Sequence, residues 1–171
     1  MEYDPQAFNN KELFERYRDS RDSWDTEARK DLDFYLGNHF TSSESDELQS
    51  RNQADIPMDR ISPAVEKLKS FMTARPPVFT ALPREDSDAK MSKVWQTMLG
   101  AVWESSDGDS QVKQSIHDFA TVGIGYLYVY IDGEADMGRG DVRFTHINPF
   151  RVYVPPSSRD RWFSDADSII L

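Results

Sequence analysis

The spacing of apolar residues changes near Gly123, and this change constrains the fold more than any other feature of the sequence. Before Gly123, apolar residues recur every three to four positions, as they do on one face of an α-helix. After it, residues 126–131 read Tyr-Leu-Tyr-Val-Tyr-Ile, a run of aromatic and β-branched residues that is typical of a strand. The pattern predicts an α+β fold, with helices first and a small sheet after them.

About four helices are expected before Gly123. The first runs from about Asn10 to Leu36, with Asn9 and Glu12 at capping-box spacing and Gly37 as its terminating residue. The other three are expected after Ser62-Pro63 and before Pro76-Pro77, after Asp86-Ser87, and from Asp109 or Ser110 to Gly123.

The sheet is expected to be small and mostly antiparallel. Its strands are predicted at residues 78–82, 126–131, 142–147 and 151–154. The glycine-rich segment 132–141 is expected to join two of them as a hairpin. The helices should pack on this sheet through large apolar side chains, namely Tyr17, Trp24, Leu32, Leu68, Val94, Trp95, Met98, Ile116, Phe119, Leu127 and Val129.

The sequence divides into four successive parts. Residues 1–40 are expected to form the N-terminal helix, 41–57 a polar loop, 58–123 a helical part with a short strand at 78–82, and 124–171 a β-rich part. The last three residues, Ile169-Ile170-Leu171, form an apolar run. Such an ending predicts that the chain is a fragment of a larger one.

Composition excludes several classes of protein. The chain has no cysteine, so it forms neither disulfides nor thiolate zinc sites. With 30 acidic against 20 basic residues, its formal net charge is −10, and it lacks the basic excess of a freestanding nucleic-acid-binding protein. The sequence holds no run of eighteen apolar residues and no signal-peptide core near its acidic N-terminus. These features predict a cytoplasmic origin and no membrane partner.

Motifs for catalysis or cofactor binding are missing from the sequence. Gly123-Ile124-Gly125 follows a helix and precedes a strand, the wrong order for a dinucleotide site, so Gly123 is interpreted as a helix cap. The carboxylates of segment 132–141 leave a weak cation site open, although Met137 stands where a calcium loop needs glycine. The histidines are too far apart in sequence for a metal motif: His39, His117 and His146. We expect a non-enzymatic protein with no catalytic, cofactor-binding or metal-binding residues.

The outer side of the first helix carries charges of alternating sign, and it is the candidate binding surface. Two interpretations stay open: a solvated helix face, or a face that meets a neighbouring subunit. Arginine suits the second, because its planar group pairs with a carboxylate through two hydrogen bonds. The candidate subunit-interface residues are Arg16, Arg18, Arg21, Asp22, Asp25 and Arg29.

An ordered series of short segments runs through the chain. The segments are DLDFYLGNHF at 31–40, RNQADIP at 51–57, DRISPAVEKL at 59–68, ARPPVFTALP at 74–83, EDSDA at 85–89, GIGYLYV at 123–129 and INPFRVYVPP at 147–156. In this order they resemble the N-terminal part of portal proteins of tailed bacteriophages, most closely those of the short-tailed type. The resemblance covers nearly the whole chain.

The resemblance implies the wing region of a dodecameric ring at one capsid vertex, through which DNA is packaged and ejected. It also implies a structural role without cofactors, and contacts with terminase, capsid or scaffold proteins and a tail adaptor. The protein would reside in the virion, after assembly in the host cytoplasm. Double-stranded DNA would pass through the ring with only weak direct binding by this acidic region.

Two other functions stay open beside the portal. One is a different virion interaction module, such as a head-completion adaptor. The other is a small metal-dependent hydrolase that uses the carboxylates of segment 132–141. Since the stem, clip and crown regions of the family have no counterpart after Leu171, we expect that these residues alone do not form the full ring.

Overall fold

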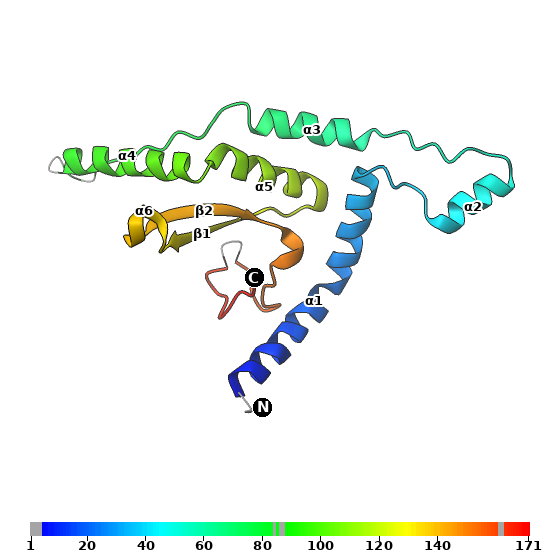
Figure 1. The fold of residues 1–171 in the computed structure, drawn as a ribbon, viewed down its shortest axis with the longest axis horizontal. Helices are drawn as coiled ribbons and strands as arrows, with labels where there is room; N and C mark the ends of the chain where they lie inside the picture. The colour runs from blue at the N-terminus through cyan, green and yellow to red at the C-terminus, as the bar shows by residue number, and fades with distance from the viewer. Residues whose placement is uncertain (1–4, 84, 86–87, 161–162) are drawn as a thin grey trace. The chain divides into compact units, whose positions relative to one another are not determined.

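The computed structural model describes residues 5–83, 85, 88–160 and 163–171 of the chain (Figure 1). The fold is α+β, as the change in apolar spacing predicts. Contacts gather the chain into two units: residues 1–63, 121–123 and 148–171 form unit 1, and residues 64–120 and 124–147 form unit 2. The elements follow the order α1 (Pro5–Tyr35), α2 (Ser42–Ser50), α3 (Ile61–Met72), α4 (Ala89–Ser105), α5 (Gly108–Val122), β1 (Tyr126–Asp132), α6 (Ala135–Gly138), β2 (Asp141–Ile147) and the 3₁₀ turn η2 (Pro149–Arg151).

Helix α1 ends where the sequence predicts and begins earlier. Gly37 has a φ of +86°, and the N–H groups of residues 37 and 38 donate to carbonyls of the last turn at 3.2 and 2.9 Å. This is the Schellman arrangement that a glycine cap favours. The predicted capping box at Asn9 is wrong, because α1 already begins at Pro5, whose fixed φ suits the first helical turn.

Helix α2 lies in segment 41–57, where the sequence predicts only a polar loop. The side chain of Thr41 accepts a hydrogen bond from the N–H of Glu44, and the Glu44 carboxylate accepts one from the N–H of Thr41 at 2.8 Å. These two bonds form a capping box. A short polar helix that depends on its cap has no apolar periodicity, so the loop prediction is wrong over Ser42–Ser50 and holds for residues 53–57.

The start of α3 is capped by a different residue from the one predicted, and α4 begins at Ala89. Asp59 Oδ1 accepts from the N–H groups of Ile61 and Ser62, both at 3.0 Å, so Asp59 caps α3 in place of Ser62. The Ser62 hydroxyl instead donates to the carbonyl of Tyr35 at 2.8 Å. Helix α4 begins at Ala89, and the predicted start at Asp86-Ser87 lies outside the described residues.

The sheet has two strands in the described part of the chain, where four are predicted. Strands β1 and β2 pair antiparallel from Tyr126↔Ile147 to Asp132↔Asp141. Residues 78–82 lie outside any strand, and the strand predicted at 151–154 is reduced to one bridge, Tyr153↔Ile170. Both segments have residues with high β-propensity. A strand also needs a second backbone segment beside it to form hydrogen bonds, and amino-acid composition does not show whether one is there.

Unit 1 is built around α1 and the C-terminal segment. Tyr17 and Ala28 of α1 are each 2% exposed, and Pro149 and Val152 of the C-terminal segment are buried as well. The Tyr17 hydroxyl lies 3.1 Å from the hydroxyl of Ser168, within hydrogen-bond distance. Residues about 150 positions apart in sequence therefore share one core.

Unit 2 packs α4 and α5 against one side of the β1–β2 hairpin (Figure 1). The indole of Trp103, near the end of α4, lies between the rings of Phe79 and Phe144, with centroid distances of 5.2 and 5.4 Å. These tilted aromatic contacts are favourable packing geometries. They anchor the C-terminal end of α4.

The predicted core is wrong at most of its positions. Tyr17 is buried, and Trp24, Leu32 and Ile116 are half-buried. The remaining predicted core residues are exposed: Leu68, Val94, Trp95, Met98, Phe119, Leu127 and Val129. Their spacing correctly marks apolar faces, but those faces are open in this chain.

Candidate subunit interface

Arg21 and Asp25 of α1 form a largely enclosed ion pair. Their side chains are 14% and 19% exposed, and Arg21 Nε and Nη2 donate to Asp25 Oδ1 at 3.0 and 2.6 Å. The same guanidinium donates to the carbonyl oxygens of Val152 and Pro149, the latter at 3.1 Å. Arg21 thus ties α1 to the C-terminal segment within unit 1.

Two aromatic rings complete the surroundings of Arg21. The guanidinium carbon lies 4.7 Å from the ring centroids of both Trp24 and Tyr153, within the range of cation–π contacts. We call Arg21, Asp25, the two rings and the two carbonyls the Arg21 clamp. The clamp engages Arg21 and Asp25 inside one chain.

The other predicted interface residues lie on exposed parts of α1. Arg18, Asp22 and Arg29 are separated by four and seven positions, which puts them on one side of the helix. Arg16 lies elsewhere around the helix, with its guanidinium 5.9 Å from the ring of Tyr17. The structure therefore places the six predicted residues on one helix and does not bring them into one cluster.

Local partners of these exposed charges are weak. Arg18 Nη2 lies 2.9 Å from Oδ1 of Asp19, and this hydrogen bond raises the pKa of Arg18 above its ordinary value. The two side chains are more than half exposed, so solvent screens their attraction. Arg29 lies 5.0 Å from the ring of Phe150. The side formed by Arg18, Asp22 and Arg29 keeps its charges available to a partner.

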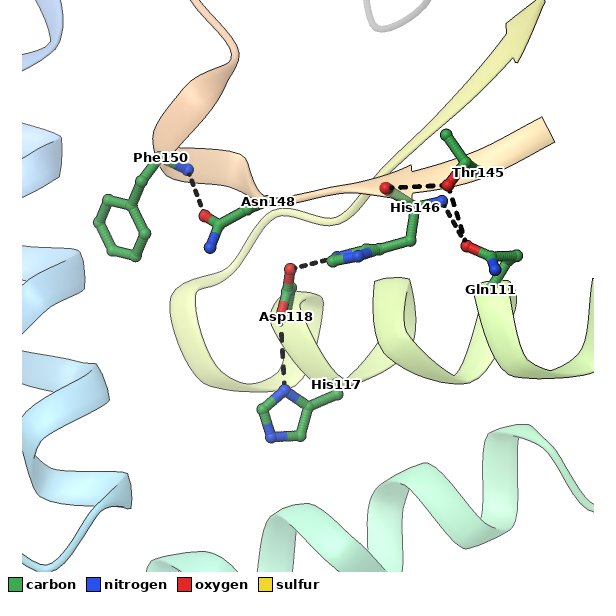
Figure 2. Close-up of polar contacts among 7 residues, drawn as sticks. All are labelled: Gln111, His117, Asp118, Thr145, His146, Asn148 and Phe150. Atoms are coloured by element: carbon green, nitrogen blue, oxygen red, sulfur yellow. Dashed lines mark hydrogen bonds and ion pairs between the residues drawn. The ribbon is translucent and has the colours of Figure 1, made fainter. Parts of the chain in front are cut away.

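A polar network in unit 2 joins α5 to β2 (Figure 2). Gln111 Oε1 accepts from the backbone N–H of His146 at 2.7 Å and from the hydroxyl of Thr145 at 3.3 Å. His146 Nε2 lies 2.6 Å from Asp118 Oδ2. Because an ionised carboxylate only accepts, this geometry assigns the Nε2 proton to His146.

The same carboxylate brings together two histidines that are far apart in sequence. His117 Nδ1 lies 3.4 Å from Asp118 Oδ1, on the other oxygen from His146 (Figure 2). Helical periodicity places Asp118 on α5, but only the fold places β2 beside it. No local sequence signal pairs Asp118 with His146.

Metal and membrane sites are not found in the part of the chain that the structure describes. There, no group of three or more histidine, aspartate or glutamate side chains could hold a metal ion. In the hairpin, Asp132 lies 3.6 Å from Arg143 and Asp136 lies 3.9 Å from Arg139, so these carboxylates have cationic partners. No described helix is both long and apolar enough to cross a bilayer.

A pocket of about 230 Å³ opens beside Trp103, between the end of α3 and the start of α5. Its charged lining residues are Arg75, Asp109 and Lys113. Small-molecule sites commonly enclose about 300–1,000 Å³. The pocket is below that range and holds no set of catalytic groups.

Helix α4 carries an apolar stripe that is open to solvent. Met91, Val94, Trp95 and Met98 have the spacing of one helix face, and their exposures are 57%, 52%, 54% and 50%. The helix from Ala89 to Trp103 also contains two lysines and no carboxylate, within a chain of net charge −10. Exposed apolar stripes of this kind mark interaction surfaces.

Residues 11–171 match the family model described as phage P22-like portal protein. No curated protein matches the chain.

Proposed function

Because the chain belongs to the family of phage P22-like portal proteins, we propose that the exposed charged side of α1 is a surface by which the subunit meets its neighbour in the portal ring. The observation that carries this proposal is the family match over residues 11–171 together with charges on α1 that the chain leaves exposed.

The function of the chain follows from its family. It is a structural component of the portal, the head-to-tail connector ring through which phage DNA is packaged and ejected. As a portal component it belongs to the virion, to an oligomeric ring, and to a vertex that contacts capsid and terminase proteins. The match favours this role over the head-completion adaptor and the metal-dependent hydrolase.

The finer features of that role are part of the proposal. We infer a dodecameric ring with this region in its wing, contacts with a scaffold protein and a tail adaptor, assembly in the host cytoplasm, and no enzymatic activity. Direct binding to double-stranded DNA is weak, because a chain of net charge −10 with no more than two adjacent basic residues neutralises few phosphates.

Ring geometry supports the choice of surface on α1. Neighbours in a closed ring meet through two different, complementary surfaces. Arg18 and Arg29 offer planar donors beside Asp22, so this side can pair with a mixed or acidic surface of the next subunit. Arg16 extends the candidate surface, while Arg21 and Asp25 hold the helix in place. Exposed pairs fix the register of an interface more than they raise its affinity.

The test is a double charge reversal, Arg18→Glu with Arg29→Glu, in the complete gene product. Both side chains are exposed, so the subunit should keep its circular dichroism spectrum and its unfolding midpoint. Ring formation, measured by sedimentation velocity and electron microscopy, should fall. If this variant forms normal rings, the exposed side of α1 faces solvent and is not a subunit interface.

The control is the single reversal Arg139→Glu in the otherwise unsubstituted gene product, which lowers the net charge by two units where the double variant lowers it by four. Arg139 is 83% exposed and lies in the hairpin, away from α1 in sequence. Its reversal changes the net charge in the same direction without touching the proposed surface. Equal loss of rings in the control and in the double variant would assign the effect to net charge and refute the proposal.

A further inference from the structure

The outer edge of β2 is already occupied by side chains of its own unit. The backbone N–H of Phe144 donates to Ser106 Oγ at 3.2 Å, and that of His146 donates to Gln111 Oε1 at 2.7 Å (Figure 2 shows the second bond). These two N–H groups therefore point away from β1. In an antiparallel pair this identifies Phe144↔Val129 and His146↔Leu127 as pairs that share no backbone hydrogen bond.

The same alternation fixes the directions of the backbone groups in β1. Since bonded and non-bonded pairs alternate, the N–H groups of Leu127, Val129 and Ile131 point outward, away from β2. The side chains of these residues are 44%, 66% and 76% exposed. Within the described part of the chain, no third strand lies along this edge. A two-stranded sheet is marginal by itself, and an open apolar edge is a template for another strand.

A second uncharged segment has no backbone partner among the residues that the structure describes. Residues 78–82 read Val-Phe-Thr-Ala-Leu and lie between prolines 77 and 83. Val78, Thr80 and Leu82 are exposed while the residues between them are half-buried, the alternation of an extended strand. Among the described residues, none of these five takes part in a backbone–backbone hydrogen bond.

We propose that, in the portal ring, segment 78–82 of one subunit adds as a third strand to the outer edge of β1 of the next subunit. The inference rests on the proposed function, in which the chain is a ring subunit. Segment 78–82, which lies between prolines, has the same length of five residues as the edge from Leu127 to Ile131. Addition of a strand to an open sheet edge is an established mode of recognition.

A second copy is the occupant for two reasons. In the described part of each subunit, β1 has an open edge and segment 78–82 has no backbone partner, and a head-to-tail ring can close such a pair of surfaces. Both segments are uncharged in a chain of net charge −10, so two copies repel each other least where these surfaces meet. The hydrogen bonds of the edge are then completed without any further partner.

The experiment uses engineered cysteines, because residues 1–171 contain none; any cysteine elsewhere in the gene product is first replaced by serine. Val129→Cys and Thr80→Cys are placed in separate copies of the complete gene product, and the copies are mixed before assembly and oxidised. Each residue is the centre of its segment, so the two thiols face each other in either strand direction. Cross-strand neighbours lie within disulfide reach. We expect a covalent dimer in the mixture and none from either variant alone.

Other crosslinking outcomes would overturn the proposal. Dimers of the Val129→Cys variant alone would show pairing of two β1 edges. A disulfide within one chain that carries both Val129→Cys and Thr80→Cys would show that segment 78–82 covers the β1 edge of its own chain. Rings that assemble without any crosslink would refute this inference and leave the portal role standing, whereas failure of the unsubstituted protein to form rings would count against the portal role itself.

A proline pair gives an independent readout. Val129→Pro removes an outward N–H at the centre of the edge and leaves the bonds to β2 intact. Val142→Pro is the control, since Val142 pairs with Ile131 and its N–H also points away from the hairpin, on the opposite edge. We expect ring yield at least about tenfold lower for Val129→Pro than for the control, which corresponds to about 1.4 kcal/mol. Equal yields, with equal circular dichroism spectra, would refute the proposal.

Discussion

Replacing Arg21 by alanine should destabilise unit 1 by about 2–4 kcal/mol. The substitution removes donors to Asp25 and to the carbonyls of Pro149 and Val152, and it removes the cation between two aromatic rings. Hydrogen bonds to a charged group contribute about 1.5–3 kcal/mol each, and cation–π contacts about 0.5–2 kcal/mol. These terms are not additive, and partial exposure of the pair lowers them, which sets the expected range.

The cost of leaving Asp25 without its cation gives a similar range of destabilisation by a second argument. Asp25 keeps 19% exposure, so it would be left as a mostly enclosed carboxylate without its cation. Breaking a fully buried pair in this way costs about 3–5 kcal/mol, and a pair with some access to water costs less. The double variant Arg21→Ala with Asp25→Ala should therefore be more stable than the sum of the single effects implies.

Urea unfolding followed by circular dichroism measures the effect. With a denaturant slope of about 2 kcal/mol per molar, Arg21→Ala should lower the midpoint by about 1–2 M. The control is Arg18→Ala, whose pair with Asp19 is exposed and should contribute about 0–1 kcal/mol. If the two variants unfold within about 0.3 M of each other, the clamp does not stabilise the unit and the reasoning is refuted.

Four further perturbations test unit 2 and helix α2. Gly108→Ala should destabilise by about 1–3 kcal/mol in urea unfolding, because a Cβ there would lie 2.3 Å from the Trp103 indole. Gly100→Ala, which meets nothing within 4 Å in the middle of α4, should stabilise by about 0.5–1 kcal/mol. Asp118→Ala should cost about 1–3 kcal/mol by the same assay, since it removes the acceptor of His146. Hydrogen bonds from Thr41 lower the pKa of Glu44, so the stabilisation of α2 is present above the ordinary value of 4.5 and is lost as pH falls through the lowered pKa. The protection of the α2 amides, measured as their exchange rates relative to an unstructured peptide at the same pH, should therefore decrease there. Protection that stays constant with pH would contradict this.

Features set by neighbouring residues could be predicted from the sequence. Gly37 and Gly123 end their helices with positive φ angles, because a glycine at this position adopts that geometry without steric cost. The hairpin follows from alternating residues on either side of a glycine-rich turn, and its register begins with Tyr126 opposite Ile147. In each of these cases the physical cause lies within a few residues of the effect.

Features that depend on distant backbone could not be predicted in the same way. The Arg21 clamp joins residues about 130 positions apart, and Asp118 meets His146 only because α5 lies beside β2. The charge pattern of α1 marks Arg21 as available to any partner. Only the fold shows that carbonyls of the same chain already occupy it.

The errors in the predicted core have a single physical cause, and they carry information about assembly. Periodicity shows that Trp95, Met98 and Val129 lie on apolar faces, but it does not show which surface covers a face. A monomeric protein seldom leaves such residues open over several elements, since full burial of one apolar side chain contributes about 1.5–3 kcal/mol and these half-exposed side chains obtain only part of it. A subunit whose native state is a ring can leave them open, because its neighbours supply the missing contacts. The apolar stripe of α4 and the unpaired edge of β1 are thus consistent with the family of the chain: both are surfaces that folding of one copy does not complete and that closure of a ring can.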